Sequence, residues 1–152
     1  SAASDVYKRQ VKENLKTKKT VKKNINNRYK EFIWPTKGDI ILNFGRIKPG
    51  LHNDGINIKS YSGADVLASS DGKIVYTGNE IPGYGNLILI KHSDNWVTAY
   101  AHLQMISIRK GSLVKKGQKI GTVGKSGNVR SPQLHFEIRK GKKVLDPMKL
   151  LS

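Results

Sequence analysis

The residues of this chain best suited to acid–base or metal chemistry are its four histidines. An imidazole changes charge near neutral pH and binds zinc through a ring nitrogen, so histidines brought together can act as ligands or proton carriers. Cysteine is absent, which excludes disulfides, thiol nucleophiles and thiolate zinc sites. A catalytic or metal site would therefore be built on His52, His92, His102 or His135 with nearby polar groups.

The run SPQLHFEI around His135 predicts a strand with one polar and one apolar face, because successive strand residues point to opposite sides. The apolar face should lie on a core. The polar face must then look into solvent, another sheet or a groove. The apolar set is Leu134, Phe136 and Ile138, and the polar set is Gln133, His135 and Glu137.

From residue 32 onward, short β-rich runs alternate with Gly, Pro, Asn and Asp, which is typical of strands joined by turns. This pattern predicts an all-β, sandwich-like or barrel-like domain over residues 32–152. A short helix is expected at residues 147–151, where a proline can occupy the first turn. The expected strands are 40–44, 55–58, 65–68, 73–77, 86–91, 96–102, 107–109, 119–123 and 134–139.

Two segments, 63–72 with the strand after it and 111–121, echo each other in their placement of apolar and β-branched residues around glycines. Each is expected to form a compact hairpin.

The chain has 28 basic and 11 acidic residues, a net charge of +17 that suits nucleic acid, anionic lipid or another anionic polymer. The charge is spread along the chain. Residues 1–37 hold 11 basic and 3 acidic residues, a net +8, and the remaining residues carry the other +9. Aromatic content is only 7%, and no recognition helix is visible, so no specific nucleic-acid binding is expected. No apolar run approaches the roughly 18 residues of a membrane span, and no secretory leader is recognisable.

Residues 1–31 are expected to form a basic flexible tail or linker, of which residues 1–10 differ in composition and are interpreted as non-native. A basic amphipathic helix is the alternative for residues 11–31, since Val21, Ile25 and Tyr29 are spaced four apart. The apolar stripe is thin and interrupted by lysines, which favours a solvated linker.

The motifs FIWPTKGDIILNFG, NDGINI, GYGNLILIKH, WVTAYAHL and SPQLHFEIRKG, followed by VLDPMKLL, occur in the order typical of one family. Over residues 32–151 the chain resembles the LytM or lysostaphin-type zinc endopeptidase domain, which cleaves peptide cross-links of peptidoglycan. The resemblance implies a two-sheet antiparallel β domain with a long groove.

In active members, a His-x-Gly-x-Asp motif and the second His of His-x-His-Phe supply the zinc ligands. By this resemblance Asn53 and Asn57 stand at two ligand positions and His135 at the third. His102 keeps one position flanking the zinc-bound water, and Gln133 replaces the other. Neutral amides are poor zinc ligands, and Gln133 cannot carry a proton as imidazole does.

The other two histidines are poorly placed to replace the missing zinc ligands. His52 precedes Asn53 by one residue, so its side chain should point to the opposite face of a strand unless a bulge turns it. His92 is interpreted as a structural or surface residue.

The chain most resembles the degenerate NlpD-like and EnvC-like branch, whose members activate periplasmic N-acetylmuramoyl-L-alanine amidases during cell separation. The resemblance implies a non-catalytic domain in the periplasm or cell envelope, with no zinc or other cofactor. Peptidoglycan or such an amidase would be the partner. The expected binding groove is lined by Asn53, Asn57, His102, Gln133 and His135.

Two alternatives remain open. The first is an active zinc endopeptidase with a non-standard ligand set. The second is a biotinyl-like or lipoyl-like carrier domain, which segment 111–121 also resembles. A carrier needs a modifiable lysine at a hairpin tip, and neither Met105 nor Met148 has a lysine in such a setting.

Overall fold

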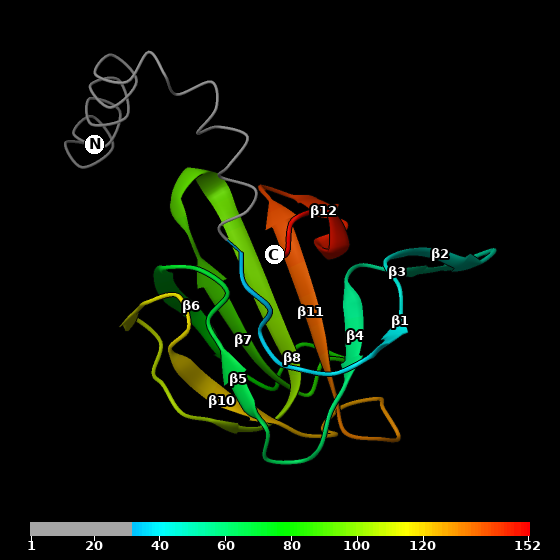
Figure 1. The fold of residues 1–152 in the computed structure, drawn as a ribbon, viewed down its shortest axis with the longest axis horizontal. Coiled ribbons are helices and arrows are strands. Elements are labelled where there is room, and N and C mark those ends of the chain that lie inside the picture. The colour runs from blue at the N-terminus through cyan, green and yellow to red at the C-terminus, as the bar shows by residue number, and fades with distance from the viewer. Residues whose placement is uncertain (1–31) are drawn as a thin grey trace, which may run out of the picture. The chain divides into compact units, whose positions relative to one another are not determined.

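A computed structural model describes residues 32–152, and the expectations for residues 1–31 lie outside this part of the chain. The described part is almost entirely antiparallel β structure, which confirms the predicted fold class (Figure 1). Its strands are β1 (Ile40–Leu42), β2 (Gly45–Lys48), β3 (Leu51–Asn53), β4 (Ile56–Lys59), β5 (Asp65–Leu67), β6 (Gly72–Gly78), β7 (Asn86–Lys91), β8 (Trp96–Ile106), β9 (Leu113–Val114), β10 (Lys119–Val123), β11 (Gln133–Lys140) and β12 (Lys143–Leu145). Two 3₁₀ turns, η1 (Ser93–Asn95) and η2 (Pro147–Lys149), complete it, and η2 occupies the predicted C-terminal helix.

The large sheet has the strand order β1-β4-β11-β8-β7-β6-β9, with β11 and β8 near its centre. β11 pairs with β4 on one side and β8 on the other, which places His135 opposite both Asn57 and Ala101. Gly55 permits the close approach of β4, because a Cβ there would lie 2.1 Å from the carbonyl oxygen of Phe136. The three strands that carry the motifs are therefore neighbours in one sheet.

The apolar face predicted for β11 is confirmed, since its apolar residues are fully buried in the main core. The residues predicted for the opposite, polar face, Gln133, His135 and Glu137, are buried as well, each at most 8% exposed. Side chains from β4 and β8 pack with the apolar face, and the rings of Tyr100 and Phe136 lie 5.4 Å apart. Each fully buried side chain of this size contributes about 1.5–3 kcal/mol relative to an exposed one. This packing fixes which face of the sheet carries the polar residues.

The two echoing segments interlock, and the prediction that each forms its own hairpin was wrong. The first segment supplies β5 and β6, and the second supplies β9 and the start of β10. The strands of one segment pair with those of the other: β5 with β10, and β6 with β9. β10 also pairs with β8, so the layer formed by β5 and β10 is continuous with the large sheet. Cross-pairing buries the apolar face of each segment against the other.

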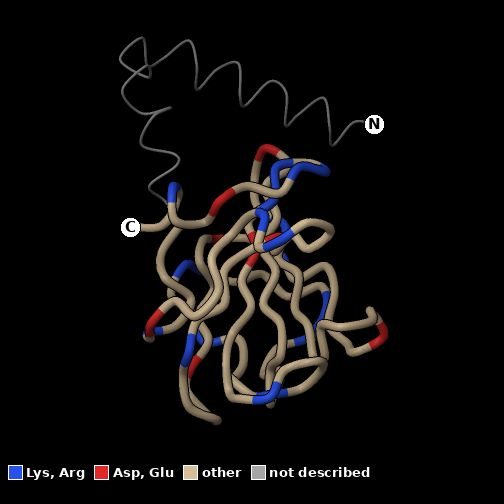
Figure 2. The backbone as a smooth tube through the Cα atoms, turned by 90° about the vertical axis from the view of Figure 1, so that its right-hand side faces the viewer, with Lys and Arg blue, Asp and Glu red and all other residues tan. Residues whose placement is uncertain are grey.

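The strand predicted at 107–109 was also wrong. Arg109 instead begins a turn, where its carbonyl accepts a hydrogen bond from Ser112 N, and the strand forms at Leu113–Val114. Besides β9, three strands were not predicted: β2, β3 and β12. No helix within residues 32–152 is long and apolar enough to cross a membrane. Lys and Arg are spread around the described backbone (Figure 2).

Candidate functional site

The five residues predicted to line a groove lie close to one another, four of them on the large sheet and Asn53 beside it, and we call them the polar row. Asn57 and His135 are cross-strand partners on β4 and β11, and Gln133 begins β11. Asn53 ends β3, and His102 lies in β8. Each is only 5–8% exposed. That a groove runs along this row remains a prediction.

The amide side chains of the row form a hydrogen-bonded ladder. Asn53 Nδ2 donates to Asn57 Oδ1 at 3.2 Å, and Asn57 Nδ2 donates to Gln133 Oε1 at 2.8 Å. Backbone carbonyls fix the direction at both ends: Asn53 Nδ2 also donates to the carbonyl of Gly55, and Gln133 Nε2 to that of Ser131. Because a carbonyl can only accept, neither end amide can be flipped without placing two acceptors together.

This direction defines the hydrogen-bonding surroundings of His135. Its Nδ1 lies 2.8 Å from Asn57 Oδ1, which is an acceptor because of the ladder, and its Nε2 lies 2.8 Å from Glu137 Oε2. Both ring nitrogens therefore lie against oxygen acceptors, and the ring is held between Asn57 and Glu137.

Glu137, Arg139 and Tyr84 extend the network, and the sequence reasoning had assigned them no role. Arg139 Nε donates to Glu137 Oε1 at 2.8 Å, and the Tyr84 hydroxyl donates to Glu137 Oε2 at 2.9 Å. Burial alone would raise the pKa of Glu137, but hydrogen bonds and charge from His135 and Arg139 outweigh burial and lower it. Burial and the Glu137 carboxylate raise the pKa of Tyr84 to about 12. The sequence already indicated two of these contacts, because Glu137 and Arg139 follow His135 at alternate positions and so lie on the same strand face.

His102 is held in an unusual backbone conformation, with φ of +64°. Its N–H donates to the carbonyl of Tyr84, and its Nδ1 lies 2.8 Å from the carbonyl of Ser126. Burial lowers its pKa, with the nearby His135 acting in the same direction, so the ring is neutral near pH 7. Nδ1 then carries the proton, and Nε2 has an open lone pair with no partner among the described residues.

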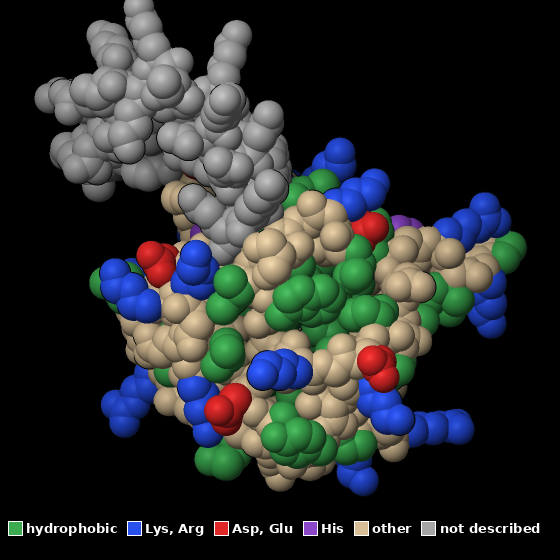
Figure 3. All heavy atoms as spheres, viewed as in Figure 1, with side chains coloured by type: hydrophobic (Ala, Val, Ile, Leu, Met, Phe, Trp, Pro, Cys, Tyr) green, Lys and Arg blue, Asp and Glu red, His purple; other side chains and the backbone are tan. Residues whose placement is uncertain are grey.

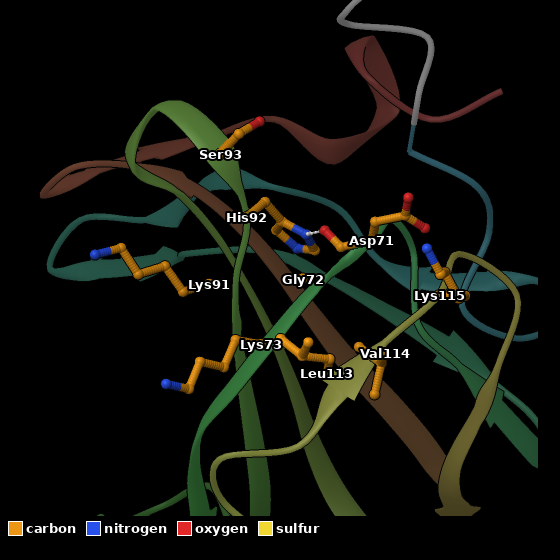
Figure 4. A pocket seen from close by; sticks show the side chains of 9 residues that line it. All are labelled: Asp71, Gly72, Lys73, Lys91, His92, Ser93, Leu113, Val114 and Lys115. Carbon is orange, nitrogen blue, oxygen red and sulfur yellow. Dashed lines mark hydrogen bonds between the residues drawn. The ribbon is translucent and has the colours of Figure 1, made fainter. Parts of the chain in front are cut away.

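The remaining histidines lie away from the row. His52 is exposed, and its Nδ1 lies 3.1 Å from Asp54 Oδ1, so it does not turn toward Asn53. His92 is buried, with its Nδ1 2.6 Å from the carbonyl of Asp71 and its Nε2 2.8 Å from Thr98 Oγ1. It is a structural residue, as predicted, and it is not on the surface. It borders a pocket of about 460 Å³ that also contains Lys73, Lys91 and Lys115 (Figure 4).

The donor set of the polar row does not fit a zinc ion. Both nitrogens of His135 are engaged, at 2.8 Å each, by Asn57 and Glu137, so neither is turned toward a metal position. Asn57 Oδ1 already accepts two hydrogen bonds, from Asn53 and His135. Within residues 32–152, no group of three or more His, Asp or Glu side chains is arranged to hold a metal. The arrangement is a hydrogen-bonded structure, and it contains no activated nucleophile.

Sequence comparisons place this site in a known context. The profile described as Peptidase family M23 matches residues 51–147. The chain is 50% identical over 119 residues to the cell division protein DipM of Caulobacter vibrioides, covering 78% of this chain and 20% of DipM. It is 46% identical over 118 residues to the murein hydrolase activator NlpD of Escherichia coli, covering 78% of this chain and 30% of NlpD. The chain thus spans less than a third of the length of either relative.

Solved structures show the same fold. A zinc-containing peptidase from Vibrio cholerae matches with a TM-score of 0.73 and 32% identity, over 78% of this chain and 40% of the peptidase. The catalytic domain of lysostaphin from Staphylococcus simulans matches with a TM-score of 0.68 and 30% identity, over 73% of this chain and 90% of that domain. None of these four relatives is a carrier protein.

Proposed function

Because this chain belongs to peptidase family M23 but carries a donor set that does not fit zinc, we propose that it is a non-catalytic LytM-type domain. In this proposal it activates a peptidoglycan amidase, or binds peptidoglycan, in cell-wall remodelling and cell separation. It acts in the cell envelope, on the periplasmic side, without zinc. Its partner enzyme is an N-acetylmuramoyl-L-alanine amidase.

The observation that carries this proposal is the pair of contacts that engage His135. Cleavage of an amide by this family needs a metal-bound water, whose pKa the metal lowers toward about 7. Here the side chain at the third ligand position has both nitrogens 2.8 Å from oxygen atoms of Asn57 and Glu137, and amides occupy the other two positions. Gln133, at the second flanking position, cannot relay a proton. A peptidase mechanism therefore lacks both its metal and one of its proton carriers.

The named relatives support the activating role. NlpD is described as a murein hydrolase activator and DipM as a cell division protein. Other relatives are described as lipoproteins, including outer membrane antigenic lipoprotein B of Haemophilus influenzae, which is 46% identical over 118 residues. These descriptions support a cell-envelope location for this chain.

The polar row offers a partner hydrogen-bond acceptors. His102 Nε2 and Asn53 Oδ1 have no donor among the described residues, whereas the other side-chain nitrogen and oxygen atoms of the row each have a hydrogen-bond partner in the row or next to it. An extended peptide or a partner loop presents backbone N–H groups, which suit such acceptors. The row therefore suits binding of a polypeptide better than chemistry on one.

Two assays on the purified chain test this proposal. The first incubates the chain alone with purified peptidoglycan and measures release of cleaved cross-link peptides, with lysostaphin as positive control. The second measures dye release from labelled peptidoglycan by an N-acetylmuramoyl-L-alanine amidase of the same organism, with and without the chain. We expect no products in the first assay and stimulation in the second.

Endopeptidase products that disappear with His135→Ala would contradict the non-catalytic assignment and support the zinc peptidase alternative. Absence of stimulation with every amidase of the organism would contradict the activating role. Peptidoglycan binding is measured separately by co-sedimentation with cell-wall sacculi.

A further inference from the structure

The β2–β3 hairpin is the one part of the described chain that forms a sheet of its own. Its two strands pair only with each other, outside the large sheet. In Figure 1 it projects from the body beside β1 and β4. An isolated two-stranded hairpin is marginally stable in water, so its outer edges and faces are open to a partner.

The hairpin exposes large apolar side chains together with positive charge. Ile47 is 44% exposed and Leu51 is 45% exposed. Arg46 and Lys48 are also exposed and form no ion pair within residues 32–152, and residues 45–52 include no acidic residue. Figure 3 shows hydrophobic and basic side chains together on this projection. Aliphatic groups flanked by unpaired cations favour an apolar surface that carries carboxylates.

Asn53 connects this hairpin to the polar row. Its Nδ2 donates to the carbonyl of Asn43, just before the hairpin, and to the carbonyl of Gly55, just after it, at 3.2 and 2.8 Å. One amide therefore closes the base of the hairpin and joins the ladder to Asn57, with one of its two hydrogens shared between two acceptors. A hairpin clamped at its base loses less conformational freedom when it binds, which favours affinity.

We infer that the β2–β3 hairpin is a docking arm that binds an acidic, partly apolar surface of a partner protein. The inference rests on the proposed function and deepens it by naming where the amidase contacts this chain. A second copy of the chain is a poor occupant, because a net charge of +17 opposes self-association. Peptidoglycan offers carboxylates but no extended aliphatic surface for Ile47 and Leu51.

Surface variants of the full chain test the docking arm. Ile47→Asp/Leu51→Asp removes the apolar contact, and Arg46→Glu/Lys48→Glu reverses the charge. Matched controls are Leu113→Asp, at a leucine that is 79% exposed on β9, and Lys73→Glu/Lys91→Glu at the pocket of Figure 4. Binding to an immobilised N-acetylmuramoyl-L-alanine amidase of the same organism is measured by biolayer interferometry, alongside stimulation and sacculus co-sedimentation. Thermal unfolding checks the fold of every variant.

We expect both hairpin variants to weaken amidase binding by tenfold or more, while the controls stay within twofold and sacculus binding is unchanged. The charge-reversal pair keeps the test decisive if the Asp pair fails to fold. Wild-type affinity in both hairpin variants overturns the inference and leaves the proposed function standing. A larger loss in Lys73→Glu/Lys91→Glu overturns it in favour of the pocket, and a loss confined to sacculus binding overturns it in favour of peptidoglycan.

The experiments distinguish failure of the docking arm from failure of the proposed function. Amidase binding that depends on the hairpin but brings no stimulation supports the docking arm and contradicts the proposed function. A wild-type chain that neither binds nor stimulates any amidase of the organism overturns both.

Discussion

Asn57 Oδ1 lies 2.8 Å from His135 Nδ1, so these two side chains meet directly in a hydrogen bond. They stand at positions where active relatives are expected to hold a metal between a carboxylate and an imidazole. The amide oxygen of Asn57 carries no full charge, and the ladder keeps its Nδ2 turned toward Gln133. The contact thus occupies His135 Nδ1, and no metal ion stands between the two side chains in this arrangement.

We expect the wild-type chain to bind no stoichiometric zinc, and Asn53→His/Asn57→Asp to gain measurable affinity. The double variant restores an imidazole and a carboxylate, which zinc favours at about 2 Å. Isothermal titration with ZnCl₂ measures the zinc affinity of the wild-type chain and the double variant. Metal analysis after purification in zinc buffer gives the zinc content of each. Peptidase activity is not expected to return, because Gln133 remains.

The control for this experiment is His52→Ala in the double variant, because His52 is the only other histidine next to the restored ligands in sequence. We expect no change in zinc affinity. One tightly held zinc per wild-type chain, lost in His135→Ala, would show that the ladder rearranges around a metal.

Glu137→Gln should destabilise the fold by about 3 kcal/mol, since removing one partner of a buried ion pair leaves the other uncompensated. The Glu137 side chain is 2% exposed and receives hydrogen bonds from His135, Arg139 and Tyr84. Urea denaturation gives the free energy of unfolding. The matched control is Asp65→Asn, whose exposed pair with Lys119 should contribute at most about 1 kcal/mol. Equal losses in both variants would contradict a buried charge network.

Features of the site that depend on neighbouring residues could be predicted from the sequence, and features that depend on residues far apart in the chain could not. The alternation in residues 133–138 is local, so it identified the apolar and polar faces of β11 correctly. The direct contact between Asn57 and His135 depends on strand pairing across 78 residues of sequence, which no local pattern encodes. The amide ladder depends in turn on that pairing.

The β2–β3 hairpin was missed for a different reason. Gly45, Pro49 and Gly50 in the run GRIKPGLH are typical of a loop, and the alternation between them is too short to indicate strands. The interlocked pairing of β5 with β10 is also non-local, so the two echoing segments were predicted as separate hairpins.

His102→Asn should keep the fold while weakening amidase stimulation about three- to tenfold, the effect of losing one hydrogen bond of about 1 kcal/mol. An Asn amide can replace Nδ1 as donor to the Ser126 carbonyl, and Asn tolerates positive φ. It cannot reach the position of Nε2. The melting temperature and the concentration of chain giving half-maximal stimulation are compared with those of His52→Asn, an exposed control. Full stimulation by His102→Asn would show that Nε2 accepts no bond from the partner.

The free energy of unfolding should fall as pH drops below the unfolded pKa of about 6.5 for histidine, partly because of His92. Burial lowers the pKa of His92 and outweighs the Asp71 carbonyl and carboxylate, which favour the charged form. Because the folded pKa lies below the unfolded one, the unfolded chain binds more protons in this range, and stability is lost on acidification. The pKa of His102 is also lowered, so His102 contributes to the same pH dependence of the free energy of unfolding. The effect of His92 is therefore measured in a His102→Asn background. Urea denaturation at pH 7.5 and 5.5 should show a smaller loss when His92→Gln is added to that background. An identical loss with and without His92 would contradict a neutral, buried His92 in the folded chain.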